Sequence, residues 1–383
     1  MLVFFYVLDQ RTKDPGFVGF VLALQAIPFF LLGGWAGRVA DRFDRRLVLA
    51  LSELVSALLM VGIAAWAWID PALSPWVLAA TAVGLAVLST YSMPARGAAV
   101  PRLVPTEELM DAQALSNATN SVISMAGLAV SALALGPVAA VSGNLFFPLA
   151  ALINAVTYLA SGLIYLALPP IVPEADEEHP LDDKKAGWKA VKADGFMRVA
   201  IFGFASMSLI FSGFYPVYLV TNREWFRGSF TDLAWIEFSF FVTMILASGL
   251  IAGLKVKKVG LSFSLGLVFV AALVAGMAFS RNYYVYLLLN ALCGLGVPFC
   301  SIPVQTYVGT NFPDAIRGRV GAFLAAAQMG VQPVGLFLVG AILATVGLER
   351  TYLAMGISSM VIALGLLAFR SFRDSQIAEP QAA

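Results

Sequence analysis

The sequence predicts an all-α membrane protein made of two six-helix bundles, with eleven full membrane spans and a partial first helix. The expectation rests first on composition: of 383 residues, 60% are hydrophobic and only 12% are charged. The mean hydropathy is +0.85, which is more apolar surface than a soluble domain can bury. The apolar residues also form runs long enough to cross a bilayer. One long polar segment separates these runs into two sets of six.

The apolar runs define the expected helices in chain order. The first, residues 1–8, is too short to cross a hydrocarbon core of about 30 Å as a helix. It has neither a basic leading segment nor a small-residue cleavage site, so we interpret it as the outer half of a first helix whose start is missing. The expected full spans are 16–36, 47–69, 76–93, 117–140, 145–168, 197–220, 232–254, 261–279, 283–308, 320–346 and 351–369.

The basic residues predict the orientation of these helices. If successive loops alternate sides, three quarters of the 24 lysines and arginines fall on one side and none falls inside a span. Cytoplasmic loops carry such an excess of positive charge. We therefore expect a multi-pass protein of the bacterial inner membrane, with the segment Gly33 to Arg46, the central polar segment and the C-terminus in the cytoplasm.

The polar segment divides the chain into two halves. It opens with prolines and is rich in charge, which is typical of a linker. Ser92-Met93-Pro94 and Ser301-Ile302-Pro303 end the fourth and tenth runs, an internal repeat typical of secondary transporters. The expected parts are the N-terminal half at 1–168, the linker at 169–196, the C-terminal half at 197–370 and a tail at 371–383.

Several classes of function are disfavoured by what the chain contains. Its net charge of +1 offers no basic field for nucleic acid. Cys293 and Cys300 would lie about 10 Å apart along a helix, too far to bridge. His179, in the linker, is the only histidine, so the histidine-based constellations of intramembrane enzymes and metal sites cannot form. We expect no enzyme activity, no catalytic residue, no metal and no cofactor. A channel stays a remote alternative, because no selectivity-filter repeat is visible.

The segment Gly33 to Arg46, GGWAGRVADRFDRR, is the most distinctive stretch of the chain. It places three glycines and six charges within fourteen residues, between two apolar runs. We expect a tight charged hairpin at the membrane surface. Gly37 is expected to let the backbone turn sharply, and Gly33 with Gly37 forms a G-x-x-x-G face for close helix approach.

The run Gly37 to Arg46 resembles the signature between helices two and three of the major facilitator superfamily, with Val39 replacing the usual leucine. Pro94 to Ala118 and Val308 to Val320 resemble the loops of a bacterial branch that includes macrolide and multidrug exporters, the enterobactin exporter and, more distantly, lysophospholipid transporters. The resemblance covers nearly the whole chain. It implies a monomeric alternating-access transporter that exports small amphipathic compounds, with a lysophospholipid or siderophore carrier as the alternative.

The resemblance also implies a conformational latch. Similar transporters use the motif aspartate, here Asp41, beside the start of helix eleven, here near Val320, and an arginine below helix four, here Arg96. We hypothesise that these groups hold the outward-open state. Arg45 and Arg46 have a simpler interpretation, in which their positive charges only keep this loop in the cytoplasm. The expected motif comprises Gly37, Asp41, Arg42, Arg45, Arg46 and Arg96, with Arg317, Gly318 and Arg319 in the equivalent loop of the second half.

Proton coupling would need an acid inside the membrane. The candidates are Glu53, Glu237 and, at the outer end of the first run, Asp9. Glu53 has an alternative role as an anchor for the bases of the hairpin, and Glu237 lies near the outer side, where water could reach it. A degenerate antiporter signature at Gly136-Pro137 favours proton antiport, although such a pair also suits a simple helix kink.

Polar residues deep in the spans are the candidates for a substrate cavity. Amides and phenols among many phenylalanines and methionines suit a bulky amphipathic substrate, although such residues also join helices in any membrane protein. The absence of a basic cluster at mid-membrane argues against a carrier of phosphate or multivalent anions. The candidates are Gln25, Asn154 and Gln328, which interrupt apolar stretches near mid-depth, and Asn120, Tyr158, Tyr215, Asn290 and Gln332.

Overall fold

The computed structural model describes residues 2–103, 135–172 without 142, 186–253 and 256–377, with positions 119, 123, 126, 127 and 133 between them. This part of the chain is helical, and its only β pairing is an isolated bridge between Lys258 and Gln376. The chain forms two compact units. The N-terminal unit is Met1–Glu178 with Ser229–Ala234, and the C-terminal unit is His179–Gly228 with Trp235–Ala383.

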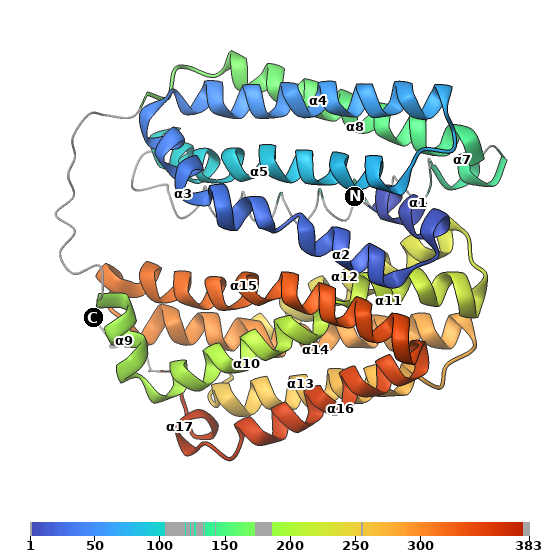
Figure 1. Cartoon of the computed structure of the whole chain (residues 1–383). Coiled ribbons are helices and arrows are strands. Elements are labelled where there is room, and N and C mark those ends of the chain that lie inside the picture. Colours follow the sequence, from blue (N-terminus) through green and yellow to red (C-terminus); the bar gives the residue numbers. More distant parts are fainter. Residues whose placement is uncertain are drawn as a thin grey trace. The chain divides into compact units, whose positions relative to one another are not determined.

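The N-terminal unit is organised around α4, which packs along both α5 and α8 (Figure 1). Gly162 of α8 allows a close approach, because a Cβ there would lie 2.9 Å from the Leu54 side chain of α4. The described helices of this unit are α1 (Leu2–Thr12), α2 (Pro15–Leu24), α3 (Ile27–Arg42), α4 (Arg45–Ile69), α5 (Pro75–Leu103), α7 (Gly136–Val141) and α8 (Gly143–Ala167).

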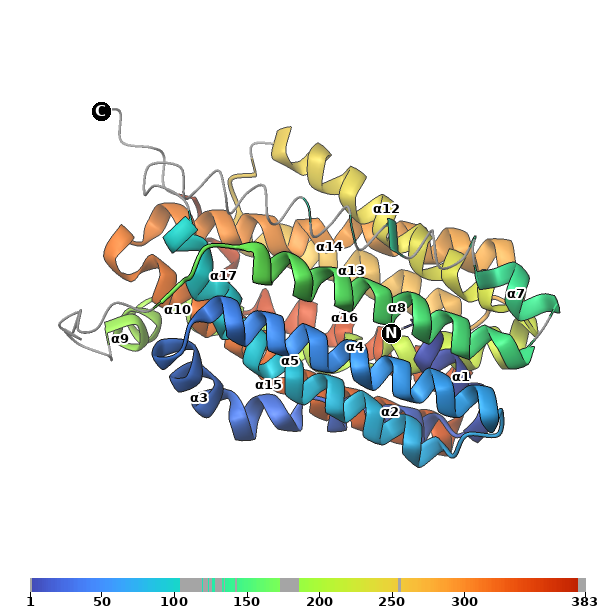
Figure 2. The ribbon, with the colours of Figure 1, turned by 90° about the horizontal axis from the view of Figure 1, so that it is seen from above.

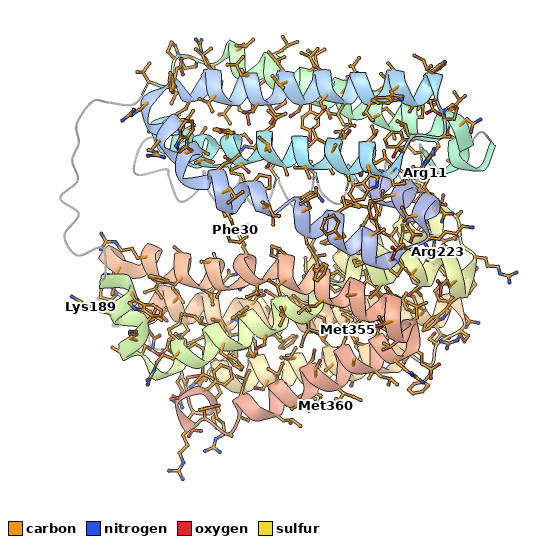
Figure 3. The ribbon with its side chains drawn as sticks, viewed as in Figure 1. Arg11, Phe30, Lys189, Arg223, Met355 and Met360 are labelled. Atoms are coloured by element: carbon orange, nitrogen blue, oxygen red, sulfur yellow. The ribbon has the colours of Figure 1, made fainter. Side chains whose placement is uncertain are left out.

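The short helix α1 is tied to the far end of α4. The guanidinium of Arg11 donates hydrogen bonds to the carbonyl oxygens of Pro71 and Leu73, which lie in the loop between α4 and α5. Figure 3 labels Arg11 at this end of the unit. Asp14 then caps α2 by accepting a hydrogen bond of 2.8 Å from the Gly16 N–H. The next break, at Gln25 and Ala26, falls just before Pro28, where proline disfavours a continuous helix.

The predicted sharp turn at Gly37 is wrong. Helix α3 runs through Gly37 to Arg42, and the chain turns only at Phe43, whose backbone is extended with φ −108° and ψ 159°. Glycine weakens a helix by about 1 kcal/mol but does not end it. The turn is set instead by Asp44, whose Oδ1 accepts a hydrogen bond of 3.0 Å from the Arg46 N–H and caps α4.

The predicted close approach at the G-x-x-x-G face is also absent from the described part of the chain. A Cβ added at Gly33 or Gly37 would meet no atom within 4 Å. These glycines therefore do not serve the packing of helices within the described N-terminal unit. Tight glycine contacts occur elsewhere, as at Gly162 on α8.

The C-terminal unit packs α13 between α14 and α16, and α10 against α15 (Figure 1). Figure 2 shows α13 and α14 running side by side. The elements are α9 (Ala186–Ala193), α10 (Gly195–Phe211), α11 (Phe214–Thr221), η3 (Asn222–Phe226), α12 (Phe230–Gly253), α13 (Val259–Met277), α14 (Tyr283–Asn311), α15 (Asp314–Val346), α16 (Leu348–Leu366) and α17 (Arg370–Arg373). The first residues of α12 group with the N-terminal unit.

Helix α9 lies within the expected linker and packs on α15. Its Trp188 ring lies 5.4 Å from that of Phe323, and the Lys192 ammonium lies 5.0 Å from the same tryptophan. Lys189 on this helix is labelled in Figure 3. Asp194 then caps α10 by accepting from the Met197 N–H at 2.9 Å, and it accepts from the Tyr307 hydroxyl at 3.0 Å.

The first residues of the expected tail belong to the core of the C-terminal unit. Phe372 is fully buried and stacks on Phe196 with ring centres 5.3 Å apart. The Val259 N–H donates to the Ser375 carbonyl at 3.1 Å, and the Ile377 N–H donates to the Lys257 carbonyl at 3.3 Å. The segment after α16 therefore covers the start of α13.

The described residues confirm an all-helical membrane protein. Nine segments are long and apolar enough to cross a bilayer: Pro15–Ala40, Arg45–Ile69, Pro75–Arg96, Asn144–Ala167, Gly195–Phe226, Phe230–Ile251, Val259–Met277, Tyr283–Asn311 and Arg319–Val346. The predicted count of eleven is not confirmed. Most of the expected span at 117–140 lies outside the described residues, and α16 covers the expected last span.

The two repeat sites occupy matching places in two long helices. Ser92 to Pro94 lies in the later part of α5, and Ser301 to Pro303 lies in the later part of α14. Each helix has 29 residues. Both continue past the proline, whose missing N–H and ring are tolerated in membrane helices when neighbouring groups compensate.

Candidate functional site

A largely apolar cavity of about 380 Å³ lies inside the C-terminal unit. Six of its thirteen lining residues are aromatic, and the volume suits one drug-sized molecule. The lining comes from five helices: Met207, Phe211 and Ser212 at the end of α10, Phe214, Tyr215 and Tyr218 from α11, Glu237, Phe240, Phe241 and Met244 from α12, Val270 from α13, and Cys293 and Val297 from α14.

The break between α10 and α11 places the aromatic wall. Phe211, Phe214, Tyr215 and Tyr218 follow the spacing that brings residues to one helix face, and the Phe211 and Phe214 rings stack 5.4 Å apart. Gly213 sits at this break, where an added Cβ would lie 2.2 Å from the Val339 Cβ of α15. Only glycine therefore allows α11 to approach α15 so closely.

Among the described residues, Glu237 is the only acid in the lining, and no lysine or arginine lines the cavity with it. Its Oε1 atom is buried and has no hydrogen-bond partner within the described residues. The other titratable groups in the lining are Tyr215, Tyr218 and Cys293. A carboxylate in such surroundings is costly unless it takes up a proton or meets a cation. Glu237 and Tyr215, both candidates from the sequence, line this same cavity.

Asn290 has a structural role beside this cavity and is not among the residues that line it. It is fully buried. Its Oδ1 accepts a hydrogen bond of 2.5 Å from the Tyr218 hydroxyl, and its Nδ2 donates to the Ile236 carbonyl at 2.6 Å. One amide thus joins α11, α12 and α14. The Ile236 carbonyl belongs to the residue before Glu237, so the network holds the backbone that presents the carboxylate.

A second buried hydroxyl network joins α11, α14 and α16. The Thr221 and Tyr352 hydroxyls lie 2.9 Å apart, and the Tyr352 and Tyr286 hydroxyls lie 2.6 Å apart. Tyr218, Tyr286 and Tyr352 were not among the candidates from the sequence. Tyr218 could have been found, because it lies three residues after Tyr215 and seven after Phe211 on one helix face.

The remaining cavity candidates are dispersed. Asn154 lines a separate cavity of about 310 Å³ in the N-terminal unit, together with Phe4 and Met60. Gln25 ends α2 at the break before α3. Gln328 and Gln332 lie one turn apart on α15 and do not line the cavity around Glu237. Asn120 lies outside the described residues.

Glu53 pairs with Arg96 of α5. The Glu53 Oε1 and Arg96 Nη2 atoms lie 3.6 Å apart, with the arginine side chain 55% exposed. Tyr158 and Ser161 of α8 interact with the same carboxylate. The contacts of Glu53 are thus with α5 and α8, whereas Arg46 lies at the start of α4.

Arg45 and Arg46 both make hydrogen bonds close to the turn. Arg46 Nε lies 3.5 Å from Asp44 Oδ2, and its Nη1 donates to the Leu168 carbonyl at 3.1 Å. Arg45 Nε donates to the Ala40 carbonyl at 3.2 Å. Arg42 is exposed, and the Asp41 side chain lies outside what the structure describes. The latch formed by Asp41 and Arg96 stays a prediction.

The second-half residues Arg317, Gly318 and Arg319 lie in a helix rather than a loop. Helix α15 begins at Asp314, six residues before the expected start at Val320. Pro313 precedes it, and proline suits the start of a helix because an N–H is not required there. The Arg317 guanidinium donates to the Phe312 carbonyl at 3.4 Å.

Asp9 and the Gly136-Pro137 pair both lie in the N-terminal unit. Asp9 is buried on α1. Gly136 and Pro137 are the first two residues of α7, and Leu135 directly before them is π-helical. A Cβ at Gly136 would lie 2.1 Å from the Thr231 hydroxyl oxygen, so this glycine serves a close contact.

These features define a multi-pass helical membrane protein with an internal cavity, and sequence comparison places it in a family of transporters. A sequence model described as the Major Facilitator Superfamily matches residues 1–226. This is more than half of the chain, and the protein belongs to that superfamily. It is therefore a membrane transporter rather than an enzyme.

Characterised relatives include two efflux proteins and a third transporter. The chain is 22% identical to macrolide efflux protein A of Streptococcus pyogenes, over 95% of this chain and 89% of the relative. It is 24% identical to the multidrug efflux pump Tap of Mycobacterium tuberculosis, over 100% and 91%. It is 25% identical to the staphyloferrin A transporter of Staphylococcus aureus, over 91% and 86%.

Solved structures share the fold at low sequence identity. The nucleoside transporter NupG aligns with a TM-score of 0.67 and 15% identity, covering 96% of each chain. A D-xylose-proton symporter aligns with a TM-score of 0.64 and 15% identity, covering 96% of this chain and 95% of that one. These likenesses support the fold class and do not assign a substrate.

Proposed function

We propose that this protein is a proton-coupled exporter of small amphipathic compounds, drug-like or macrolide-like, in the bacterial inner membrane. It works as a monomer by alternating access. The observation that carries the proposal is the cavity of about 380 Å³ with one carboxylate among aromatic and methionine side chains. The efflux relatives support the direction of transport.

The lining of the cavity supports an amphipathic substrate. Phenylalanine and methionine offer apolar contact of adaptable shape. Ser212, Tyr215 and Tyr218 supply the few polar atoms that orient a ligand. Such a site holds a substrate mainly by shape and burial, which suits compounds that also dissolve in lipid.

Glu237 is the acid best placed to couple transport to protons. It faces the cavity, and its Oε1 atom has no hydrogen-bond partner among the described residues. Glu53 is already paired with Arg96, so a structural role suits it better. Proton and substrate would then meet at one carboxylate, which can bind either but not both. This competition is the simplest form of antiport.

The conformational latch is proposed on the cytoplasmic side, where Asp41 lies in the last turn of α3 and Arg96 lies in the later part of α5. The excess of basic residues on this side supports the cytoplasmic assignment of the linker and the C-terminus. Asp41 would hold the outward-open state by accepting hydrogen bonds from the start of α15 and from Arg96.

The experiment that tests the function is transport in proteoliposomes with an imposed pH gradient. The dye ethidium should accumulate against its gradient only when the pH gradient is present. Glu237→Gln should reduce this transport at least tenfold. The matched control Glu224→Gln removes an acid that pairs with Arg223 at 3.3 Å in an exposed setting, and it should leave transport unchanged. Equal transport without a pH gradient would disprove proton coupling.

A lysophospholipid or siderophore transporter is the second candidate, supported by the staphyloferrin A transporter among the relatives. The lining of the cavity has no lysine or arginine to hold an anionic siderophore. The same proteoliposomes, supplied separately with a lysophospholipid and with an iron-loaded carboxylate siderophore, decide between the candidates. Transport of either compound without dye transport would replace the proposed function.

A further inference from the structure

We propose that the cavity around Glu237 selects organic monocations, with the carboxylate pairing the positive charge and the aromatic wall surrounding it. This inference rests on the proposed export function, because it names the class of compound that the cavity takes. Three features of the cavity lead to it: the single acid, whose buried Oε1 atom has no hydrogen-bond partner within the described residues, the ring arrangement and the fixed backbone beside Glu237.

The charge balance of the lining favours a cation. Glu237 is the only charged residue in the lining, and its buried Oε1 atom lacks a hydrogen-bond partner within the described chain. An organic cation in the cavity would pair with this carboxylate at low dielectric, where ion pairing is strong. A neutral compound leaves the carboxylate unsatisfied unless a proton is bound, and an anion adds repulsion. The cavity therefore selects its ligands by their charge.

The aromatic side chains extend this preference beyond the carboxylate. Cations are attracted to the faces of phenylalanine and tyrosine rings. Phe214 stands between Phe211 and Tyr218, with ring centres 5.4 Å and 5.2 Å away. Across the lining, Phe240 and Phe241 of α12 lie 5.7 Å apart in an edge-to-face arrangement. A quaternary or tertiary ammonium, or a phosphonium, is too poorly hydrated to lose much when it enters such surroundings.

The cavity also limits the size and the number of charges. About 380 Å³ holds one compact ring system and not an extended polycation. A single carboxylate neutralises one positive charge, so a dication would carry an unpaired charge into the membrane interior. The expected ligand is therefore a compact, apolar compound with one delocalised or shielded positive charge.

The carboxylate is held ready for this contact. The Asn290 amide donates to the Ile236 carbonyl at 2.6 Å and accepts from the Tyr218 hydroxyl at 2.5 Å. Thus the backbone next to Glu237 and one ring of the cavity are fixed by the same buried amide. Binding a cation then requires little reorganisation, which favours affinity.

Matched probes test the proposal by binding. Tetraphenylphosphonium and tetraphenylborate have nearly the same size and shape but opposite charge. Their binding to the full chain in nanodiscs is measured by isothermal titration calorimetry. We expect the cation to bind at least tenfold more tightly than the anion. Glu237→Gln should lower the affinity for the cation at least tenfold, whereas Glu237→Asp should retain most of it. Glu224→Gln serves as the control acid and should leave it unchanged.

A second measurement needs no variant. Dicyclohexylcarbodiimide modifies buried carboxyl groups, and peptide mass spectrometry identifies the modified residue. Tetraphenylphosphonium should slow modification of Glu237 in the wild-type chain, and tetraphenylborate should not. Equal binding of the two probes, cation affinity within twofold of wild type in Glu237→Gln, or modification unaffected by the cation would each overturn the proposal.

The outcomes separate this inference from the proposed function. If neutral amphipathic dyes are exported as well as cationic ones, and tetraphenylphosphonium does not protect Glu237, the export function stands and the cation selection fails. If no dye is exported but the cation binds with the stated dependence on Glu237, the proposed export function fails and the cation site stands.

Discussion

The Tyr218 hydroxyl donates a hydrogen bond of 2.5 Å to Oδ1 of Asn290, and both side chains are buried inside the C-terminal unit. Because the same amide donates to the Ile236 carbonyl, one residue connects α11, α14 and α12 beside the cavity. This connection explains how an aromatic wall on one helix and an acid on another keep a constant relation to each other.

Replacing Asn290 should therefore destabilise the C-terminal unit. Asn290→Leu leaves the Tyr218 hydroxyl and the Ile236 carbonyl buried without partners, at a cost of about 1–3 kcal/mol for each buried group. The midpoint of thermal unfolding, followed by size-exclusion chromatography after heating, should fall by several degrees. Asn144→Leu changes an exposed asparagine of α8 and should have little effect. Equal midpoints for the two variants would contradict the structural role.

Gly213 should not tolerate a side chain. Its missing Cβ would lie 2.2 Å from the Val339 Cβ, so Gly213→Ala forces α11 and α15 apart at a cost of about 1–3 kcal/mol. Gly249→Ala is the matched control, because its Cβ meets no described atom within 4 Å. Val339→Gly should partly restore the thermal stability of Gly213→Ala. A double variant no more stable than Gly213→Ala alone would show that the contact is not responsible.

Asp44 should be important for stability, although it is not one of the predicted motif residues. Its Oδ1 accepts from the Arg46 N–H and the Ile171 N–H, both at 3.0 Å. Asp44→Ala removes a helix cap and a link to the segment after α8, at a cost of about 1–2 kcal/mol. Asp70→Ala, which removes a single exposed contact to the Ala72 N–H, should cost less. Thermal unfolding of the two variants compares them directly.

Phe372 should contribute to the core in spite of its place near the C-terminus. It is fully buried against Phe196, and Phe→Ala at buried sites costs about 3–5 kcal/mol. Phe372→Ala should lower the yield of monodisperse protein and its thermal midpoint. Phe369→Ala removes a ring that is 55% exposed and should change both little. If Phe372→Ala left the yield and the thermal midpoint unchanged, the packing of this segment would not contribute to stability.

Asp41→Asn tests the latch. If Asp41 holds the cytoplasmic side closed, the neutral amide should weaken it and increase labelling, from the cytoplasmic side, of a cysteine introduced at Gln328. Transport should slow as well. Cys293 and Cys300 are buried. Any labelling of these two native cysteines is measured in the protein without the introduced cysteine and is subtracted. Unchanged labelling and unchanged transport would eliminate the latch.

The position of the turn in the charged motif could not be predicted from the local sequence. Glycines suggested a turn at Gly37, but helix α3 continues to Arg42 because its backbone hydrogen bonds persist through glycine. The turn depends on Asp44, whose second contact, with the Ile171 N–H, comes from a residue 127 positions away. No local rule can anticipate a cap that is reinforced by such a distant segment.

Spacing along the chain could not predict the partners of Glu53 and Asn290 either. Glu53 was expected to serve the nearby bases, yet it meets Arg96 of α5. Asn290 was expected in a cavity, yet it is used for helix packing. Membrane interiors offer few polar groups, so each finds whichever partner the packing of helices brings near, regardless of sequence distance.

Composition and the lengths of the apolar runs were sufficient to predict a helical membrane protein, because a bilayer admits few ways to satisfy the backbone. The charged motif was sufficient to indicate the superfamily. Only the tertiary structure showed that Glu237 shares a cavity with the face formed by Phe211, Phe214, Tyr215 and Tyr218. That relation depends on how α11, α12 and α14 pack, and packing is set by contacts between residues far apart in the chain.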